Sequence, residues 1–220
     1  MDTKALRQKI LDLAIRGKLV PQDPNDEPAS VLLGRIRQQK QQMVKEGKLK
    51  PKDIKNDSVI FVGEDNLHYE KFADGSVKCI EDEIPFDLPE GWEWVRLGSV
   101  GDMTLGKMLD VTKNKGTLRP YLRNINVRWG AFELSDVLEM RFEDDELERY
   151  SIRHGDLVIC EGGEPGRCAV WQSEEVVFYQ KALHRVRAIE VLPEFLYYVI
   201  RHFIISNQYE RYYTGTTIKH

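Results

Sequence analysis

The chain begins with two segments in which apolar residues recur at helical spacing. Leu6, Ile10 and Leu13 predict a short amphipathic helix, with Asp2 or Thr3 as its cap and Gly17 as its stop. Three prolines between residues 21 and 28 then impose a rigid turn. A second helix is expected from about Pro28, because its apolar positions share one face: Leu32, Leu33, Ile36, Met43 and Val44. We expect its other face to be basic and solvated: Arg35, Arg37, Gln38, Lys40, Gln41 and Lys45.

The rest of the chain has the short apolar runs that are typical of strands. Residues 47–91 lose periodicity and predict a linker, with one hairpin around the turn dipeptide Asp74-Gly75. Further strands are expected at residues 92–97, 121–127, 156–160, 168–171, 175–179 and 184–189. A closing helix should start at Pro193, where apolar residues again repeat at three and four. These patterns predict a mixed α/β (α+β) fold: a twisted β-sheet domain with flanking helices, preceded by an N-terminal helical pair.

Composition narrows the class of protein. The 220 residues, 41% of them hydrophobic, suffice for one ordinary core or two small ones. Charged residues make up 31% and Arg201 interrupts the longest apolar run, so the sequence predicts no membrane span. No apolar leader with a cleavage site opens the chain, which predicts a cytoplasmic location. Cys79, Cys160 and Cys168 lack metal or disulfide spacing and are expected to be reduced thiols.

The net charge of −4 is unevenly distributed along the chain. Residues 1–52 carry +6 and residues 100–132 carry +4, whereas residues 53–99 carry −8 and residues 133–150 carry −6. Locally basic blocks can meet phosphates if the fold gathers them on one side. Composition therefore leaves nucleic-acid binding open.

No enzyme motif is complete in this sequence. The Gly-rich segment 161–167 lacks the Gly-Lys-Ser/Thr of a phosphate loop, and neither histidine nor serine stands at metal or nucleophile spacing. Glu46-Gly47-Lys48, downstream of Asp26, has the letter order of a metal-dependent nuclease but falls at the end of a polar helix. We predict a non-catalytic chain without a cofactor or metal of its own, with the nuclease as the enzymatic alternative.

Recognition chemistry is concentrated between residues 107 and 128. Arg and Lys can hold phosphates or read guanine edges, and Asn can pair with adenine, so their mixture suits a protein that reads a DNA groove. The densest set of such donors is Lys113, Asn114, Lys115, Arg119, Arg123, Asn124, Asn126 and Arg128. The alternative is a basic face that is merely exposed to water, with individual cations paired to surface acids.

Four separated phrases of the sequence carry a family likeness. They are Leu6–Leu11 with Gly17–Ser30; Ile84–Gly98; Gly155–Ile159 with Gly162-Gly163 and Gly166-Arg167; and Thr214–His220. Together they resemble the specificity subunits of type I restriction-modification enzymes. The resemblance implies a helical extension at residues 1–50, a linker with a β-hairpin at 51–83 and a target-recognition domain at 84–220. The chain is shorter than such a subunit, and we interpret it as an N-terminal fragment or a half-subunit.

The same resemblance implies a function in DNA recognition. A specificity subunit is non-catalytic, reads double-stranded DNA, and recruits a methyltransferase subunit and a restriction (translocase) subunit. This chain would read one half of a bipartite target; S-adenosylmethionine, ATP and Mg²⁺ are expected only on the partner subunits. Two further sets of candidate DNA contacts are Arg167, Gln180, Lys181, His184 and Arg185, and the weaker Thr216, Thr217 and Lys219. The alternatives are a protein-interaction module and the recognition domain of a single-chain methyltransferase or restriction enzyme.

Overall fold

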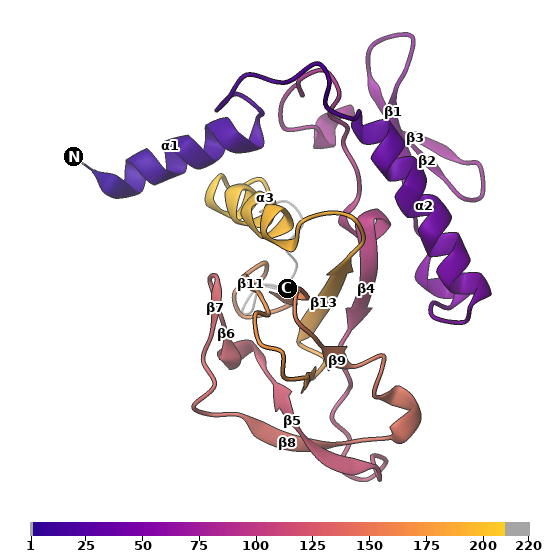
Figure 1. Ribbon diagram of the computed structural model, residues 1–220, viewed down its shortest axis with the longest axis vertical. Coiled ribbons are helices and arrows are strands. Elements are labelled where there is room, and N and C mark those ends of the chain that lie inside the picture. Colours follow the sequence, from indigo (N-terminus) through magenta and orange to yellow (C-terminus); the bar gives the residue numbers. More distant parts are fainter. Residues whose placement is uncertain (1, 210–220) are drawn as a thin grey trace. The chain divides into compact units, whose positions relative to one another are not determined.

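The computed structural model describes residues 2–209, which divide into two compact units, one up to residue 102 and one from residue 103 onward (Figure 1). Both units combine helical segments with small, mostly antiparallel sheets, which confirms the predicted mixed α/β class. Within this described part of the chain, no helix combines the length and the apolar composition needed to cross a membrane.

The two helices of the first unit form where the sequence predicts them. Helix α1 (Thr3–Ile15) begins after Asp2, whose carboxylate accepts two backbone N–H groups of the first turn. It ends before Gly17, whose φ of 64° is a left-handed conformation that glycine adopts without strain. Helix α2 (Ala29–Lys45) follows Pro28, as expected.

One cation on the face of α2 that was predicted to be solvated is buried. Lys40 is only 1% exposed, and its Nζ lies 2.7 Å from Asp57 Oδ2 and 2.6 Å from the carbonyl oxygen of Gly98. The prediction is wrong for this residue because Lys40 stands four positions after the buried Ile36, and residues at that spacing share a helix face. Its ammonium group ties α2 to two later segments of the same unit.

The segment predicted as a linker contains a three-stranded antiparallel sheet. Strands β2 (His68–Phe72) and β3 (Val77–Cys79) form the predicted hairpin, and β1 (Ser58–Val62) pairs with the other edge of β2. The sequence reading missed β1, although Val59, Ile60, Phe61 and Val62 form an apolar run of β-branched and aromatic residues.

The strand predicted at residues 92–97 is absent from the structure. This segment runs into a 3₁₀ turn at Leu97–Val100, and its side chains contact three other segments of the unit. Trp92 Nε1 donates to Gln22 Oε1 at 2.9 Å, whereas Arg96 pairs with Glu70 and Glu83. The segment is held as a connector by side-chain contacts rather than by a strand ladder.

The Arg96–Glu70 pair predicts a pH-dependent contribution to stability. Glu70 is buried, and the hydrogen bond from Arg96 holds its pKa below the usual value. A carboxyl whose pKa is lower in the folded state stabilises the fold above its unfolded pKa of about 4.3, and this contribution is lost as the pH falls through the folded value. In urea unfolding, Arg96→Met should therefore lower the free energy of unfolding more at pH 7 than at pH 3. An equal loss at both values would contradict this account.

The second unit is built on two four-stranded sheets. The order of the first is β11-β10-β13-β4 and that of the second is β8-β5-β12-β9. Their strands are β4 (Gly101–Leu105), β5 (Thr117–Leu122), β8 (Leu138–Phe142), β9 (Ser151–Ile152), β10 (Leu157–Cys160), β11 (Cys168–Val170), β12 (Val177–Tyr179) and β13 (Leu183–Ala188). A separate hairpin is formed by β6 (Val127–Arg128) and β7 (Ala131–Phe132). Helix α3 (Pro193–Ile205) begins at Pro193, as predicted.

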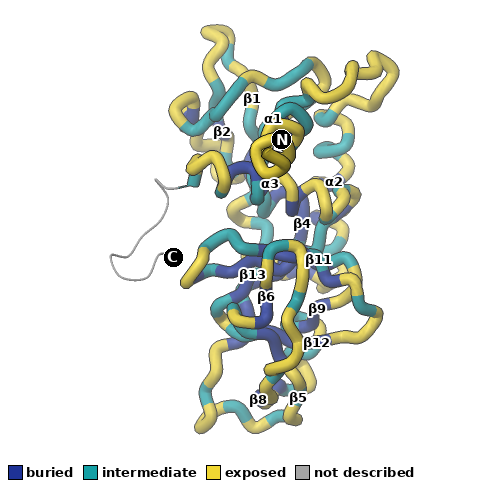
Figure 2. The backbone as a smooth tube through the Cα atoms, turned by 90° about the vertical axis from the view of Figure 1, so that its left-hand side faces the viewer, coloured by how far each residue is buried: buried dark blue, intermediate teal, exposed yellow. Residues whose placement is uncertain are grey.

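The core of the second unit lies along strands β9, β12 and β13, which are largely buried (Figure 2), and along β10, which is buried throughout. Its main cluster contains Leu122, Val127, Ile152, Val158, Cys160, Ala169, Trp171, Val177, Tyr179 and Leu183. Cys160 in this cluster and the equally buried Cys168 serve as small apolar residues, and burial raises the pKa of the Cys168 thiol to about 12. Both thiols are free, as expected.

One predicted strand of this unit is divided in two. Residues 121–127 were expected to be continuous, but β5 ends at Leu122 and a 3₁₀ turn follows at Asn124–Asn126. The cause is Asn126, whose Oδ1 accepts the backbone N–H of Arg123 at 2.9 Å and so replaces a ladder hydrogen bond with a local one. The sequence reading also missed β4, β8 and β9.

Candidate nucleic-acid interface

Three segments that are distant in the sequence meet in the second unit. They are residues 122–129, 160–167 and 180–184, and we call them the loop junction. Backbone hydrogen bonds join Gln180 N to the Leu122 oxygen (3.2 Å) and Glu161 N to the Ala182 oxygen (2.9 Å). The junction therefore brings part of the first predicted set of DNA contacts (Arg123, Asn124, Asn126 and Arg128) together with Arg167, Gln180, Lys181 and His184 of the second.

Asn124 holds two of these segments against each other. Its Nδ2 donates to the carbonyl oxygen of Gly162 at 2.8 Å, and its own carbonyl oxygen accepts Arg167 Nη2 at 2.9 Å. The Gly-rich segment is thus the turn between β10 and β11, as the absence of a complete phosphate-loop motif indicated. In this arrangement the Asn124 amide nitrogen is already engaged within the protein.

The two partly buried arginines of the junction are paired with exposed carboxylates. Arg123 Nη2 lies 2.8 Å from Asp136 Oδ2, and Arg167 Nη1 lies 2.5 Å from Glu164 Oε2. The arginine side chains are 21% and 16% exposed, whereas the two carboxylate side chains are 58% and 53% exposed. An ion pair whose acid faces water contributes little to stability. Another anion can therefore replace either carboxylate at its arginine without a large change in the free energy of folding.

Two cations of the junction are exposed on the surface. Arg128 lies in the β6–β7 hairpin, next to Trp129, whose Nε1 donates to Glu164 Oε1 at 3.1 Å. Lys181 lies in the turn between β12 and β13, and its backbone N–H donates to the Lys107 carbonyl oxygen at 2.8 Å. Both side chains project from backbone that is fixed by hydrogen bonds, which suits a binding surface.

Asn126 and Arg185 from the predicted sets lie in the core instead. Asn126 is fully buried, and its Nδ2 donates to the carbonyl oxygens of Glu133 and Asp136, both at 2.9 Å. Arg185 is 1% exposed and donates to the carbonyl oxygen of Ser151 at 3.2 Å. Their donors stabilise the fold, and a contact with DNA would require the unit to open.

Gln180 and His184 are half-buried members of the junction. The backbones of Gln180 and Lys107 form a parallel β-bridge. The close approach of these two segments depends on Gly106, which precedes Lys107. A Cβ on Gly106 would lie 2.2 Å from the Gln180 carbonyl oxygen. Burial lowers the pKa of His184, so its ring carries no charge at neutral pH.

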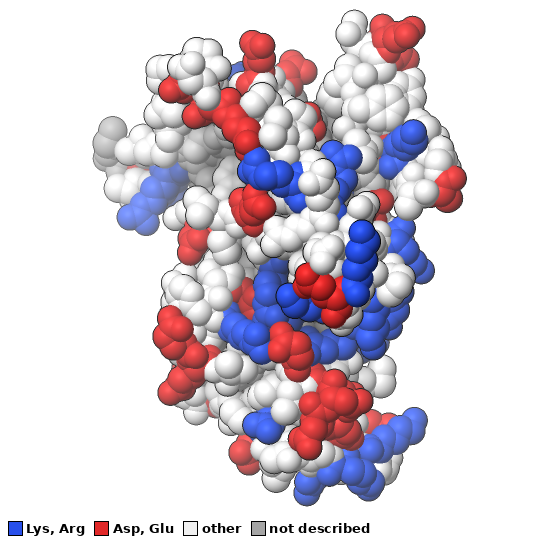
Figure 3. Space-filling view, turned by 45° about the vertical axis from the view of Figure 1, so that its right-hand side comes forward, with Lys and Arg blue, Asp and Glu red and all other residues white. Residues whose placement is uncertain are grey.

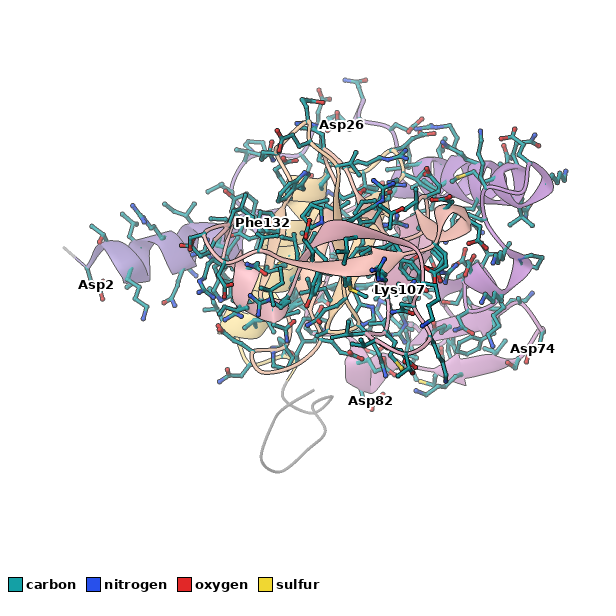
Figure 4. The ribbon with its side chains drawn as sticks, turned by 90° about the horizontal axis from the view of Figure 1, so that it is seen from below. Asp2, Asp26, Asp74, Asp82, Lys107 and Phe132 are labelled. Atoms are coloured by element: carbon teal, nitrogen blue, oxygen red, sulfur yellow. The ribbon has the colours of Figure 1, made fainter. Side chains whose placement is uncertain are left out.

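The loop between β4 and β5 carries Lys113, Asn114 and Lys115 and is clamped by one acid. Glu143 accepts the backbone N–H groups of Lys115 and Gly116, both at 2.9 Å, and also pairs with Lys107. Lys107, labelled in Figure 4, is 5% exposed and also pairs with Glu146. The pKa of Glu143 is lowered, chiefly by the Lys115 N–H. The clamp fixes both ends of the loop.

The exposed side chains of this loop differ in how far they are engaged. Lys113 is exposed and lies 3.6 Å from Asp110, whereas Lys115 projects from the clamped end. Asn114 and Arg119, the latter on β5, are half-buried: Asn114 Nδ2 donates to the Met108 carbonyl oxygen at 3.3 Å, and the Arg119 guanidinium carbon lies 5.6 Å from the centroid of the Phe178 ring. The sequence reading missed Arg141, an exposed cation opposite Leu118 on β8, because it stands in an acidic block. Figure 3 shows the resulting mixture of basic and acidic side chains at the β5–β8 end.

The described residues contain no group of three or more His, Cys, Asp or Glu side chains that could hold a metal ion. In the nuclease alternative, Glu46 is engaged by Lys48 at 2.7 Å rather than placed beside Asp26. The third predicted set, Thr216, Thr217 and Lys219, lies outside the described residues.

Curated relatives are found among restriction enzymes of Escherichia coli, although no family model matches the chain. The EcoAI type I specificity subunit is 40% identical over 156 residues, which cover 70% of this chain and 23% of the relative. The EcoEI specificity subunit is 44% identical over 112 residues, covering 51% of this chain and 15% of the relative. The chain thus spans less than a quarter of the length of these two relatives.

Two solved structures show a looser similarity. One is described as "Structural basis underlying complex assembly and conformational transition of the type I R-M system". The match covers 93% of this chain and 41% of the chain in that structure, with 14% identity and a TM-score of 0.44. The HsdS subunit from Thermoanaerobacter tengcongensis covers 56% of this chain and 30% of its own, with 19% identity and a TM-score of 0.39. These scores do not define a common fold, whereas the curated sequence matches are specific. The chain is a homologue of type I restriction enzyme specificity subunits, matched over part of their length.

Proposed function

We propose that this chain is a non-catalytic DNA-recognition component of a type I restriction-modification complex, acting in the cytoplasm. The observation that carries the proposal is its 40% identity, over 156 residues, to a type I restriction enzyme specificity subunit. In this role the second unit reads one half of a bipartite duplex target. The methyltransferase and restriction subunits are its proposed protein partners, and they hold the S-adenosylmethionine, ATP and Mg²⁺.

The loop junction is the proposed contact surface for DNA. Arg128 and Lys181 hold phosphates from rigid backbone positions, and the clamped loop adds Lys113 and Lys115. Phosphate contacts fix the position of the protein on the duplex, after which a few bidentate contacts select the bases. Asn126 and Arg185 support this surface from the core and do not touch the ligand.

Arg123 and Arg167 are the proposed switchable contacts of the junction. Asp136 and Glu164 occupy their guanidinium groups in the free protein, as a phosphate or a guanine edge would in the complex. Because the two carboxylates are more than half exposed, water can take over their solvation when DNA displaces them. In the free protein the two ion pairs keep the arginines oriented for DNA, which then replaces the carboxylates.

The proposed surface can be tested by measuring binding to a random-sequence duplex of about 30 base pairs in a KCl titration. The full chain should bind in the non-specific range of roughly 10⁻⁴ to 10⁻⁶ M, since one half-site offers few base contacts. Removing two phosphate contacts in Arg128→Ala/Lys181→Ala should weaken binding about tenfold and reduce the slope of log K against log salt by about 2.

The matched control for this experiment is Lys4→Ala/Lys71→Ala, which removes two exposed cations from the first unit. It should leave the salt slope unchanged. Equal losses in the two variants would reject the loop junction as the contact surface. If the unmodified chain binds no duplex even at low salt, DNA recognition by this chain is itself rejected.

A further inference from the structure

The first unit contains a strongly basic surface that the loop junction does not use. Helix α2 has four cations, four glutamines and no acidic residue over its 17 positions. From Arg35 to Lys55 the sequence has eight cations and two acids, although acids outnumber cations in the whole chain. Such an imbalance in one folded segment indicates an anionic partner more than a generally solvated face.

Most of these cations are exposed, and several form no ion pair within residues 2–209. Lys40 is buried against Asp57, Arg35 pairs with Glu27 and Lys48 pairs with Glu46. Among the described residues, no carboxylate forms an ion pair with the remaining exposed cations: Arg37, Lys45, Lys50, Lys52 and Lys55. We call these five residues the α2 basic surface.

The fold gathers the α2 basic surface at the C-terminal half of the helix. Arg37 and Lys45 are eight residues apart, with Gln41 between them, so the three side chains follow one stripe of α2. Leu49 is buried, and its backbone N–H donates to the Met43 carbonyl oxygen, which turns the chain back at the end of the helix. The Lys40–Asp57 pair then fixes the end of the lysine-rich turn beside α2.

A purely structural role explains only a small part of this surface. A cation in the last turn of a helix interacts favourably with the helix dipole, which accounts for Lys45. Arg37 stands in the middle of α2, and Lys50, Lys52 and Lys55 lie beyond it, where the dipole effect has fallen off. An excess of like charge in one segment is self-repelling, so this accumulation of cations does not stabilise the free protein.

The chemistry of the surface favours a phosphate backbone over an acidic protein. The cores of protein interfaces are enriched in aromatic and apolar anchors that fill pockets. None of the large apolar side chains that the structure exposes falls between Arg35 and Lys55, where the exposed residues are mainly Arg, Lys and Gln. Cations with amide donors between them match the charged oxygens of a nucleic-acid backbone, and they carry no information about bases.

We infer that the α2 basic surface is a second, sequence-independent contact for the phosphates of duplex DNA. This inference rests on the proposed function, because it takes DNA as the ligand, but it concerns the first unit alone. The surface supplies affinity and salt dependence, whereas discrimination between sequences belongs to the second unit. A recognition component with few base contacts gains residence on DNA from such a surface.

The test replaces all five cations with glutamine in the full chain: Arg37, Lys45, Lys50, Lys52 and Lys55. Glutamine keeps the polar surface and the helix propensity while it removes the charge. Binding to a random-sequence duplex of about 30 base pairs is followed by fluorescence anisotropy between 50 and 200 mM KCl. We expect the magnitude of the negative slope of log K against log salt to fall by about 3 or more, since each lost phosphate contact removes about 0.9.

The matched control removes five other cations of the same unit by the same exchange: Lys4, Arg7, Lys9, Lys18 and Lys71. The control variant should keep the slope of the unmodified chain, and circular dichroism melting should show that both variants are folded. Equal losses in the two variants would reduce the effect to net charge and overturn the inference. So would an unchanged slope in the α2 variant, or binding of poly-L-glutamate as tightly as of duplex.

The design separates this inference from the proposed function. If duplex binding depends on Arg128 and Lys181 but not on the α2 basic surface, the inference fails and the proposed function stands. If the unmodified chain binds no duplex, the proposed function fails first. A dependence on both surfaces supports both.

Discussion

Replacing Lys40 with alanine should lower the free energy of unfolding of the first unit by about 3 to 5 kcal/mol, the range found when one partner of a buried ion pair is removed. Lys40 is 1% exposed, and its ammonium satisfies both Asp57 and the carbonyl oxygen of Gly98. The variant leaves these acceptors without a donor and opens a cavity beside Ile36. Urea unfolding followed by tryptophan fluorescence measures the loss, because two of the four tryptophans, Trp92 and Trp94, lie in this unit.

The exposed Lys45 of the same helix is the control, and Lys45→Ala should change the free energy of unfolding by less than about 0.5 kcal/mol. The effect of Lys40 should also depend on pH. Burial raises the pKa of Asp57, so this carboxyl favours folding at pH values below its unfolded pKa, and that contribution is lost as the pH rises through the folded value. Without Lys40 the cost of the ionised Asp57 grows, and Lys40→Ala should recover part of its stability at acidic pH. A loss equal to that of Lys45→Ala would refute the buried pair.

Arg185→Ala should lower the free energy of unfolding of the second unit by about 3 to 5 kcal/mol, and it should remove no direct contact with DNA. The guanidinium group is 1% exposed and donates to the carbonyl oxygens of Ser151 (3.2 Å) and Arg149 (3.4 Å) and to Thr104 Oγ1 (3.4 Å). Alanine leaves these buried acceptors without that donor, at about 1 to 3 kcal/mol each, and adds a cavity, although partial relaxation limits the sum. Thermal melting and urea unfolding measure the loss.

A second variant separates this structural role from DNA contact. Arg185→Met retains much of the side-chain volume, so it should be less destabilising, and at low temperature the folded fraction should keep the duplex affinity of the unmodified chain. Lys181→Ala, in the exposed turn before β13, should show the opposite pattern, with weaker duplex binding and unchanged unfolding. If Arg185→Met is as stable as the unmodified chain but no longer binds duplex, Arg185 belongs to the DNA surface after all.

The helices illustrate what sequence pattern alone can predict. The starts of α1, α2 and α3 follow from Asp2, Pro28 and Pro193, because caps and prolines act through the backbone of their immediate neighbours. The hairpin at Asp74-Gly75 is local in the same way. The family resemblance likewise depended on contiguous phrases, and the matches to the EcoAI and EcoEI specificity subunits confirm it.

The strands and the candidate site depend on contacts between distant residues. The parallel pairing of β12 with β5 joins residues more than fifty positions apart, and no local signal marks it. The segment at 92–97 has strand-like residues but no strand partner, because its side chains are engaged by Gln22, Glu70 and Glu83. Propensity describes a residue's own backbone, whereas a strand also requires a second chain in register.

The sequence by itself determined the mixed α/β class, the three helices, the family and the chemical character of the candidate contacts, since each is encoded in neighbouring residues. Only the tertiary structure decided which polar side chains are available. It buried Lys40, Asn126 and Arg185, paired Arg123 and Arg167 with acids, and left Arg128 and Lys181 exposed. The reason is that a cation's accessibility and its partner are set by what packs against it, and that packing comes from parts of the chain far away in sequence.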